Sequence, residues 1–362
     1  MTRFIALYLP QFHPTKENDE WWGKGFTEWT NVARAPKLFH SHYQPKVPAD
    51  LGFYDLRLPE SRIAQAELAK QYGIEAFCYW HYWFGNGKRL LQRPFDEVVA
   101  SGKPDFPFCL AWANHSWAKK QFDKKGTQEM LMQQTYPGVE DFVEHFNTML
   151  PAFKDKRYVR VDGKLLFVVY NPLDDPSLKQ FMEVWQKLAK ENGLGGFYFV
   201  GKTDKGRLRK EILEFGYDAT YNDSVLNVHH HQTLLYKVLL ELRARLLHYP
   251  KIFKYKEAIK YMLSDEEKQE NAIPVIAPNW DHTPRSGANG ILLQDCKPKY
   301  FKQLVRKVIE LVKDKPADKQ IVFVKAWNEW GEGNYMEPDL KYGRGMLEAL
   351  KEAVEETASH KK

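Results

Sequence analysis

Cysteine is scarce in this sequence. Only Cys78, Cys109 and Cys296 occur among 362 residues, and no two of them have the close spacing of a metal-binding pair. This number and spacing argue against a disulfide framework and against a cysteine-based metal site. Cys78 and Cys109 stand inside apolar runs, where a reduced thiol behaves as a small buried hydrophobic group. We therefore expect a reducing, cytoplasmic environment and no metal or other cofactor.

Long hydrophobic runs are also missing. No apolar stretch approaches the roughly 20 residues that a membrane-spanning helix needs. The opening MTRFIALYLPQF does not have the pattern of a secretory signal, because its apolar part runs directly into Pro10 and Gln11. The net charge of +6 is small for this length, so we expect no nucleic-acid partner.

Aromatic residues, in contrast, are abundant. They make up 14% of the chain, with 11 tryptophans and 19 tyrosines. A large core could absorb many of them, but cores are built mainly from leucine, isoleucine and valine. Rings with one apolar face and one polar edge suit ligands with flat apolar faces and many hydroxyls. The excess therefore favours a carbohydrate-binding cleft, with simple core packing as the alternative.

Short apolar runs recur along the whole chain and alternate with segments of helical period. The runs cover residues 4–9, 75–83, 106–114, 165–171, 196–201, 217–222, 273–280 and 320–330, and the clearest helical patterns cover 61–73, 139–153, 177–193 and 300–314. Near-continuous apolar strands are typical of parallel sheets buried on both faces. Eight strands predict an α/β fold, a single (β/α)8 TIM-type barrel over residues 1–362. An open doubly wound sheet is the alternative, but the chain has no glycine-rich first turn of the dinucleotide-binding type.

Two connections are longer than ordinary loops. The first, residues 10–60, is rich in Trp, Pro and Asn, and long loops of this kind are usually functional. The second, residues 224–272, is predicted as a helical insertion between strands six and seven. Its segment 237–260 has seven basic residues against Glu241 and Glu257. This segment is either a solvated helical excursion or a basic surface that contacts an anionic glycan, a lipid-linked sugar or the membrane face.

Polar and aromatic residues gather where the predicted strands end. In a (β/α)8 barrel these carboxyl ends form the active site. Helix N-caps explain some of the Asn and Asp at such ends, but not the Trp and Tyr. The predicted substrate-binding residues are Tyr8, His13, Glu28, Trp29, Trp80, His81, Tyr82, Trp112, Asn114, Tyr170, Asn222, Asn279, Trp280, Asp281, Asn328 and Trp330.

The last strand ends in NEWGEG, which places Glu329 and Glu332 three residues apart. Two carboxylates suit hydrolysis of a glycosidic bond, because one protonates the leaving oxygen while the other acts as base or nucleophile. Their mutual repulsion raises the pKa of one partner, as a general acid requires. An ExxE spacing alone is weak, since it is common on exposed helices. Its position at a barrel strand end, beside Trp330 and between glycines, makes these glutamates the predicted catalytic pair.

Long motifs in the chain resemble those of the WbsX-type proteins, also described as glycoside hydrolase family 99-like. They are YLPQFHPTKENDEWWGKGFTEWTNV, HYQPKVPADLGFYDLR, YGIEAFCYWHYWFGNGKRLLQRP, SGKPDFPFCLAWAN and NEWGEGNYMEPD. The resemblance implies a (β/α)8 barrel that acts on glycans without a metal, in a family commonly encoded with surface-polysaccharide genes. Its hydrolase relatives are retaining, endo-acting α-mannosidases. By their motif, Glu329 would deprotonate the sugar 2-hydroxyl to give an anhydro intermediate, Glu332 would act as acid and then base, and Glu28 would bind a sugar hydroxyl.

One stretch departs from that family pattern. After the third strand the family usually continues WANENW followed by arginines, whereas this chain reads WANHSWAKK. His115 stands where a glutamate is expected, and Lys119 and Lys120 stand where arginine is expected. This change affects the predicted charge or identity of a substrate subsite and leaves the acid pair intact.

Three functions remain in competition. The first is an endo-acting glycoside hydrolase or transglycosylase, with α-mannosidase-like chemistry, on a surface polysaccharide or its lipid-linked precursor. The second is a glycosyltransferase in lipopolysaccharide, capsule or exopolysaccharide biosynthesis, although Asp174–Asp175 is no Asp-x-Asp motif at a strand end. The third is a non-catalytic glycan-binding protein. In each case the partner is a glycan or lipid-linked oligosaccharide, and segment 237–260 predicts a peripheral membrane contact.

Overall fold

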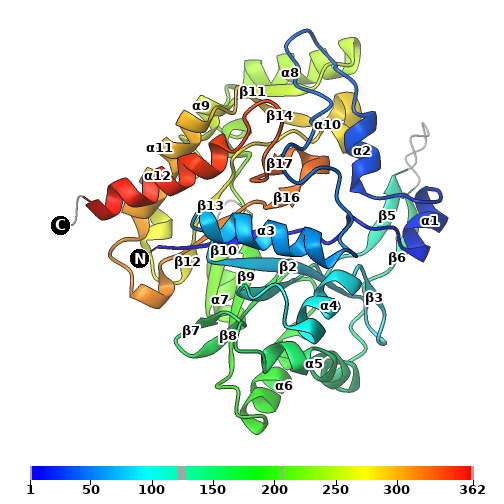
Figure 1. Cartoon of the computed structure of the whole chain (residues 1–362), viewed down its shortest axis with the longest axis vertical. Coiled ribbons are helices and arrows are strands. Elements are labelled where there is room, and N and C mark those ends of the chain that lie inside the picture. The colour runs from blue at the N-terminus through cyan, green and yellow to red at the C-terminus, as the bar shows by residue number, and fades with distance from the viewer. Residues whose placement is uncertain (1, 121–127, 205–207, 360–362) are drawn as a thin grey trace.

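The computed structural model describes residues 2–120, 128–204 and 208–359 (Figure 1). Its main sheet follows one hydrogen-bonded path, β12-β10-β9-β8-β4-β2-β1-β15-β13. The strands on this path are β1 (Arg3–Tyr8), β2 (Ala76–Trp83), β4 (Phe108–Trp112), β8 (Lys164–Val169), β9 (Phe197–Thr203), β10 (Ala219–Asn222), β12 (Ala272–Ile273), β13 (Val275–Ile276) and β15 (Ile321–Val324). Every neighbouring pair on the path is parallel.

The two ends of this path are one stretch of chain. Only Pro274 separates β12 from β13. Proline has no N–H to donate to a sheet, so the ladder is interrupted there. Its carbonyl still accepts from Phe323 N at 3.0 Å. On one side Ala272 pairs with Thr220, and on the other Val275 pairs with Phe323. The sheet therefore returns on itself, so the (β/α)8 barrel prediction is confirmed and the open-sheet alternative is wrong.

The barrel strands are buried along their length, as their apolar sequences predicted. All eight residues of β2 are buried, and so are all five of β4. Continuous burial is what a parallel sheet covered on its outer face requires. Pairing of β1 with β15 and β2, through Ile5 opposite Phe323 and Ala76, brings the two ends of the sequence together.

Helices cover the outside of the barrel (Figure 1). They are α3 (Pro59–Gln71), α4 (Arg93–Ser101), α5 (Val139–Phe153), α6 (Leu178–Glu191), α7 (Arg209–Phe215), α11 (Pro298–Val312) and α12 (Gly345–Ser359). In α11, which opens with a proline in its first turn, Phe301, Leu304, Val305 and Val308 are buried. This spacing puts one apolar face on the sheet. The four helices expected from sequence period correspond to α3, α5, α6 and α11.

The long first connection folds into two short helices, α1 (Lys16–Trp22) and α2 (Glu28–Arg34). The latter carries Glu28 in its first turn. Smaller strands extend other connections: β3 (Arg89–Leu90) pairs with β2, β7 (Arg160–Val161) pairs with β8, and β5 (Trp117–Lys120) pairs with β6 (Gln128–Met132). That residues 1–362 make one catalytic domain stays a prediction.

Between β10 and β12 the chain makes the expected excursion. It contains η1 (Asn227–His229), α8 (Leu234–Leu247), β11 (Lys251–Lys254), α9 (Tyr255–Ala258) and η2 (Asp265–Lys268). The insertion is helical as predicted in α8, and after it the only α-helix among the described residues of the insertion is the single turn of α9. Further on, Ser264 and Glu267 form a capping box that starts the separate turn η2. Local side-chain hydrogen bonds of this kind compete with a continuous helix, so the helix does not extend through this point. Over the described ranges, none of the helices combines the length and apolarity needed to cross a bilayer.

Candidate active site

A cavity of about 720 Å³ lies at the carboxyl ends of the barrel strands. Residues that follow β1, β4 and β15 meet there with the end of β2 and with the loop after β13. We call it the barrel-mouth cavity, and it is lined by Leu9, Gln11, Trp22, Phe26, Glu28, Asn31, Trp80, Tyr82, Ala113, His115, Ser116, Trp117, Ala118, Leu131, Tyr170, His282, Arg285, Ser286, Asn289, Lys325, Glu329 and Glu332.

The two predicted catalytic glutamates come from one small hairpin after β15. Strand β16 (Asn328–Glu329) pairs antiparallel with β17 (Asn334–Tyr335), and the turn between them is η5 (Trp330–Glu332). Both glutamate side chains line the barrel-mouth cavity. The spacing of three residues therefore spans one tight turn, which directs both carboxylates to the same side.

Both glycines of NEWGEG are required by close approach. A Cβ on Gly331 would lie 1.9 Å from Glu28 Oε2, so no larger residue fits there without moving that carboxylate. Gly333 has φ +55°, and its Cβ would lie 2.6 Å from Lys46 Nζ. The left-handed backbone and the crowding together favour glycine at this position.

Glu329 is almost fully buried and accepts a hydrogen bond from Trp80 Nε1 at 2.8 Å. Burial, reinforced by repulsion from Glu332, raises the pKa of Glu329 to about 8, against the opposing effects of Lys325 and Arg285. At neutral pH this carboxyl therefore keeps its proton.

Glu332 has the opposite electrostatic balance. Burial alone would raise its pKa, but the cations of Arg285 and Lys325 outweigh burial, and the pKa lies below the ordinary glutamate value. Arg285 Nη1 donates to Glu332 Oε1 at 2.7 Å, and His282 Nε2 lies 3.8 Å from the same oxygen. A hydrogen bond to Glu329 also favours the charged form. The pair thus holds one proton, on Glu329, and one negative charge, on Glu332.

Arg285 also holds Glu28. Its Nη2 lies 3.0 Å from Glu28 Oε2, so one guanidinium joins the first connection of the chain to the hairpin that carries Glu332. Arg285 belongs to α10 (Thr283–Ser286), in the loop after β13. Arg285 was not among the predicted site residues, because it stands four positions beyond Asp281, the last residue assigned to the seventh strand end, in DHTPRSGANG.

Lys325 is a second cation at the cavity that was not among the predicted site residues. Its Nζ donates to Asp223 Oδ2 at 2.5 Å and lies 4.9 Å from the centre of the Trp280 ring. Burial would lower the pKa of Lys325, but Asp223, Glu332 and Glu329 together raise it, so the lysine stays charged. Lys325 directly precedes the AWNEW motif and has no sequence signal of its own.

The residue that departs from the family motif faces the cavity. His115 lines it beside Tyr170, with 5.3 Å between ring centres. Burial, together with the Lys202 cation, lowers the pKa of His115, so the imidazole is neutral at pH 7. Lys119 Nζ lies 5.8 Å from the Trp22 ring centre. The Lys120 side chain lies outside the part of the chain that the structure describes.

Six of the predicted site residues line the barrel-mouth cavity: Glu28, Trp80, Tyr82, Tyr170, Glu329 and Glu332. The aromatic members form its wall, where the rings of Trp80 and Tyr170 meet edge to face at 5.6 Å. The geometry places the other predicted binding residues away from this lining.

Several of those residues are bound inside the barrel. The Tyr8 hydroxyl donates to Gln65 Oε1 at 2.7 Å, and His81 Nε2 lies 2.7 Å from His145 Nε2. Trp112 donates to the Trp83 carbonyl, and Asn114 donates to the Asn171 carbonyl. All four are buried, so their polar groups are bound to other parts of the protein and do not face the cavity.

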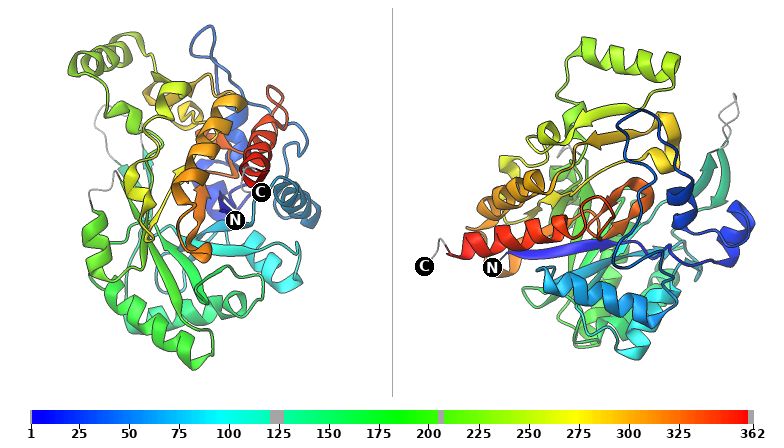
Figure 2. Two further views of the ribbon diagram at one scale, coloured as in Figure 1. Left: turned by 90° about the vertical axis from the view of Figure 1, so that its left-hand side faces the viewer. Right: turned by 45° about the horizontal axis from the view of Figure 1, so that its top comes forward.

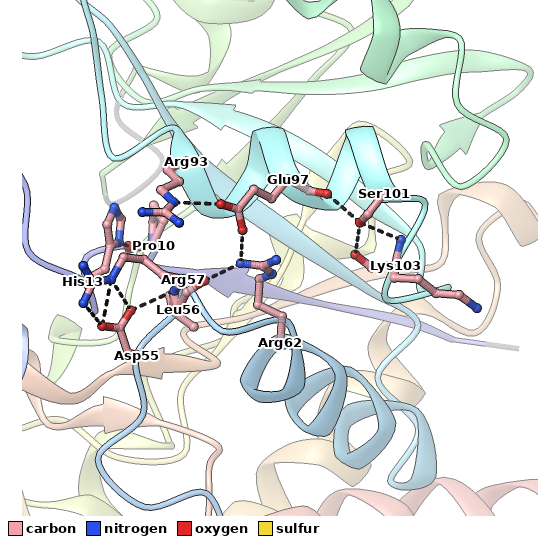
Figure 3. Close-up of polar contacts among 10 residues, drawn as sticks. All are labelled: Pro10, His13, Asp55, Leu56, Arg57, Arg62, Arg93, Glu97, Ser101 and Lys103. Atoms are coloured by element: carbon pink, nitrogen blue, oxygen red, sulfur yellow. Dashed lines mark hydrogen bonds and ion pairs between the residues drawn. The ribbon is translucent and has the colours of Figure 1, made fainter.

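His13 lies in the first connection and is not among the residues that line the barrel-mouth cavity. Its Nδ1 donates to the Pro10 carbonyl at 3.0 Å, and its ring faces Asp55, which is paired with Arg57 (Figure 3). Burial lowers the pKa of His13. Trp29 donates to the Tyr54 carbonyl at 2.8 Å. These contacts fix the path of the connection and leave neither residue on the cavity.

The residues predicted after the later strands also have internal partners. Asn222 donates to Glu267, and Asn279 accepts from Tyr335 N. Asp281 accepts from Gln44 at 2.7 Å, Trp280 lies under Lys325, and Asn328 binds both N and O of Leu9.

Trp330 is fully buried and supports the hairpin from below. Its Nε1 donates to Glu337 Oε2 at 2.6 Å, and its ring stacks on Tyr335 at 3.7 Å. Burial raises the pKa of Glu337 to about 7, opposed by the hydrogen bonds that it accepts. Trp330, predicted to bind substrate, is instead a structural anchor, since a ring with no exposed surface cannot stack on a ligand.

The chain matches the family described as "Glycosyltransferase WbsX" over residues 4–350. It is 35% identical over 356 residues to "Uncharacterized protein WxcX" of Xanthomonas campestris pv. campestris (strain B100), a match that covers 97% of this chain and 49% of the relative. The WxcX protein of strain ATCC 33913 is also 35% identical with the same coverage. The chain thus spans about half the length of the curated relatives it matches.

Two solved structures share the architecture. A "Glycoside hydrolase-like protein" superposes with a TM-score of 0.61 at 15% identity, over 97% of this chain and 93% of the other. The GH99 endo-alpha-mannosidase from Bacteroides thetaiotaomicron gives a TM-score of 0.58 at 15% identity, over 99% and 98%. At such identities the likeness establishes the fold alone.

Proposed function

This chain belongs to the family described as Glycosyltransferase WbsX, and from this membership and its paired glutamates we propose that it is a carbohydrate-active enzyme. We propose further that it cleaves a glycosidic bond within a glycan, as an endo-acting glycoside hydrolase with α-mannosidase-like chemistry. One observation carries the proposal: Glu329 and Glu332 line the same cavity with pKa values displaced in opposite directions. Two carboxyls in different protonation states are what acid–base cleavage of a glycoside needs.

The roles implied by the family resemblance are reached by moving one proton across the pair. As the side chains stand, Glu329 holds the proton and hydrogen-bonds to charged Glu332. Transfer of this proton to Glu332 gives a glutamic acid that protonates the leaving oxygen. It also leaves a charged Glu329 that takes the proton of the sugar 2-hydroxyl. The 2-oxygen then bonds to the anomeric carbon, and the leaving group departs as an alcohol.

The second half of the reaction restores the pair. Glu332 takes a proton from water, whose oxygen attacks the anomeric carbon and opens the anhydro sugar. Glu329 returns its proton to the 2-oxygen. Arg285 contacts Glu28 as well as Glu332. The Glu28 contact can therefore keep the cation in place while Glu332 is neutral.

The cavity and the family support a proposal for the substrate. Trp80, Tyr82 and Tyr170 give the cavity aromatic walls, and aromatic side chains that combine an apolar face with a polar group suit a ligand of the same character. Its volume is within the range of small-ligand sites. We propose a surface polysaccharide or its lipid-linked precursor as the glycan. The cytoplasmic location expected from the sequence stays a prediction.

A glycosyltransferase is the second candidate, and the family's own description favours it. One experiment separates the two. The protein is incubated with the surface polysaccharide of its host, and new reducing ends are measured, while a parallel series offers nucleotide sugars and an acceptor glycan. Reducing ends without any nucleotide sugar support the hydrolase. Sugar transfer that requires a nucleotide sugar, with no cleavage, would replace it by the transferase, and glycan binding without turnover in either series would leave a non-catalytic binding protein.

The glutamate roles have their own test. We expect Glu332→Gln to abolish turnover of the polysaccharide while glycan binding survives, and Glu329→Gln to be severely impaired. Glu75→Gln is the control, because Glu75 pairs with Arg3 just ahead of β2, at the opposite end of the barrel. Glycosyl fluorides need no protonation of the leaving group, so they should restore the first step, measured as release of fluoride, to Glu332→Gln and not to Glu329→Gln. Restoration of Glu329→Gln instead would make Glu329 the acid and reverse the assignment.

A further inference from the structure

Helix α8 turns its apolar face to solvent. Leu235, Val238, Leu239, Leu242 and Leu246 are 46–73% exposed, whereas Leu240 on the same helix is 5% exposed. The five exposed residues follow the i, i+3, i+4, i+7, i+11 spacing of a single helical face, which in a globular protein normally faces the core. Here it faces outward, with only Leu240 buried toward the body.

The arrangement of the chain agrees with this exposure. In both figures α8 lies at the edge of the molecule, with the rest of the protein on one side of it (Figures 1 and 2). Exposed apolar residues scattered singly are ordinary, but a contiguous apolar stripe indicates an interaction surface.

Positive charge borders the stripe. With 100° per residue, Arg243 and Arg245 fall on either side of the line through Leu242 and Leu246. The Arg243 guanidinium packs over the Tyr249 ring at 4.6 Å. The whole segment 237–260 has seven basic residues and two acidic ones, a net charge of +5. An apolar stripe flanked by arginines is the pattern of a helix that lies in the interface of a membrane.

We propose that α8 docks this protein on the surface of an anionic phospholipid bilayer. The helix has 14 residues, a length of about 21 Å, which suits it to lie along the surface and is too short to span the hydrocarbon core. Its leucines enter the boundary between headgroups and acyl chains, and its arginines contact lipid phosphates. A second copy of the chain fits less well, because it would bring the same excess of positive charge against this face.

The docking helix is connected to the wall of the cavity. The strand that follows α8, β11, pairs in parallel with β14 (Ile291–Gln294) through Lys251 opposite Ile291. The loop that leads into β14 carries His282 and Arg285, both of which line the barrel-mouth cavity. A glycan whose lipid carrier is held in the bilayer would therefore meet the enzyme beside α8. This part of the inference rests on the proposed function, whereas docking itself does not require turnover.

Vesicle sedimentation tests the docking. The full chain is mixed with phosphatidylcholine vesicles, and with vesicles in which about a third of the lipid is phosphatidylglycerol. We expect binding to the anionic vesicles that weakens at high salt. The combined variant Leu239→Asp, Leu242→Asp and Leu246→Asp should lose about tenfold or more of it, and Arg243→Gln with Arg245→Gln should weaken it and remove most of its salt dependence. Leu340→Asp is the matched control, because Leu340 is 69% exposed outside α8.

A fluorescent reporter gives a second measurement that does not depend on a disruptive variant. Cys78, Cys109 and Cys296 are all buried, so Leu242→Cys can be labelled selectively with an environment-sensitive dye. Its emission should shift to the blue on anionic vesicles, and the same dye at Leu340→Cys should not respond. The proposal is overturned if the wild type fails to bind anionic vesicles, or if the triple variant binds them equally well. It is also overturned if the lipid-free wild type is a dimer that the triple variant converts to a monomer, with no vesicle binding by either.

Discussion

Arg285 Nη1 donates to Glu332 Oε1 at 2.7 Å, and its cation lowers the pKa of Glu332, so that the proton shared by the two glutamates rests on Glu329. The same guanidinium contacts Glu28 at 3.0 Å. Arg285 is thus the common partner of two acids that belong to opposite ends of the chain. Its cation keeps Glu332 charged, while Glu329, which is buried and accepts a hydrogen bond from Trp80, remains neutral.

Removal of this cation should change the pH profile. In Arg285→Gln the pKa of Glu332 rises, because burial is no longer opposed by its nearest cation. We expect kcat/KM to fall by about 10- to 100-fold and the acidic limb of the profile to move toward neutral pH. The basic limb of the wild type should lie near pH 8, where Glu329 loses its proton. Initial rates measured from pH 4 to 10 check both limbs.

The control for that variant is Arg306→Gln, which removes an exposed arginine paired with Glu356. Arg285→Lys keeps the charge without the forked geometry, so its limbs should stay near those of the wild type while the rate falls. A profile of unchanged shape in Arg285→Gln would reduce Arg285 to a structural contact.

The buried Glu329 should make the folded protein less stable as the pH rises. Its folded pKa of about 8 lies above the ordinary value of 4.5. The folded state therefore holds this proton more tightly than the unfolded chain, and stability is lost as pH rises from about 4.5 to 8. Glutamine stays neutral throughout. We expect Glu329→Gln to be more stable than the wild type by on the order of 2 to 4 kcal/mol at pH 8, with little difference at pH 4.5.

Thermal unfolding of both proteins at several pH values measures this difference. Glu67→Gln on α3 serves as the control, because Glu67 is exposed and its replacement should give a shift that does not grow with pH. An advantage of Glu329→Gln that is equal at pH 4.5 and pH 8 would contradict the raised pKa.

Gly331→Ala should disturb the site by crowding Glu28. The new Cβ would stand 1.9 Å from Glu28 Oε2 and 3.0 Å from Arg285 Nε. We expect a stability loss of about 1 to 3 kcal/mol together with a large loss of activity. Shortening the clashing partner should relieve the strain. Urea unfolding should therefore find Gly331→Ala with Glu28→Ala at least as stable as Gly331→Ala alone, and a strictly additive loss would argue against the clash.

Asp281 should stabilise the folded protein at neutral pH and lose this contribution in acid. Burial alone would raise the pKa of Asp281, but His42, Lys46 and Thr283 overcome it and bring the pKa to about 2. A carboxyl whose pKa is lowered by folding stabilises the protein fully above its unfolded pKa, near 3.8, and this stabilisation is lost as the pH falls toward 2. We expect Asp281→Asn to lose about 2 kcal/mol at pH 7 and less at pH 3. Chemical denaturation at the two pH values would show the opposite order if Asp281 were unpaired.

The sequence by itself determined the barrel and the placement of Glu329 and Glu332 together at a strand end. Strands buried on both faces must be apolar along their whole length, so runs such as the one ending at Val324 could be counted without a structure. Glu329 and Glu332 could be found because the turn that places them is local, three residues long and marked by glycine. The break at Pro274 did not hide the seventh strand, since the apolar run continues through it.

Tertiary structure alone decided what each buried polar side chain faces. Arg285 meets Glu28 across 257 positions, and Trp80 meets Glu329 across 249. The periodic patterns of a sequence do not predict contacts between residues so far apart along the chain. For the same reason Asn328 and Trp330 were predicted to bind substrate, whereas in the structure they hydrogen-bond to Leu9 and Glu337. A strand end limits where a residue can lie, whereas its direction, toward the cavity or toward an internal partner, depends on segments that only folding brings together.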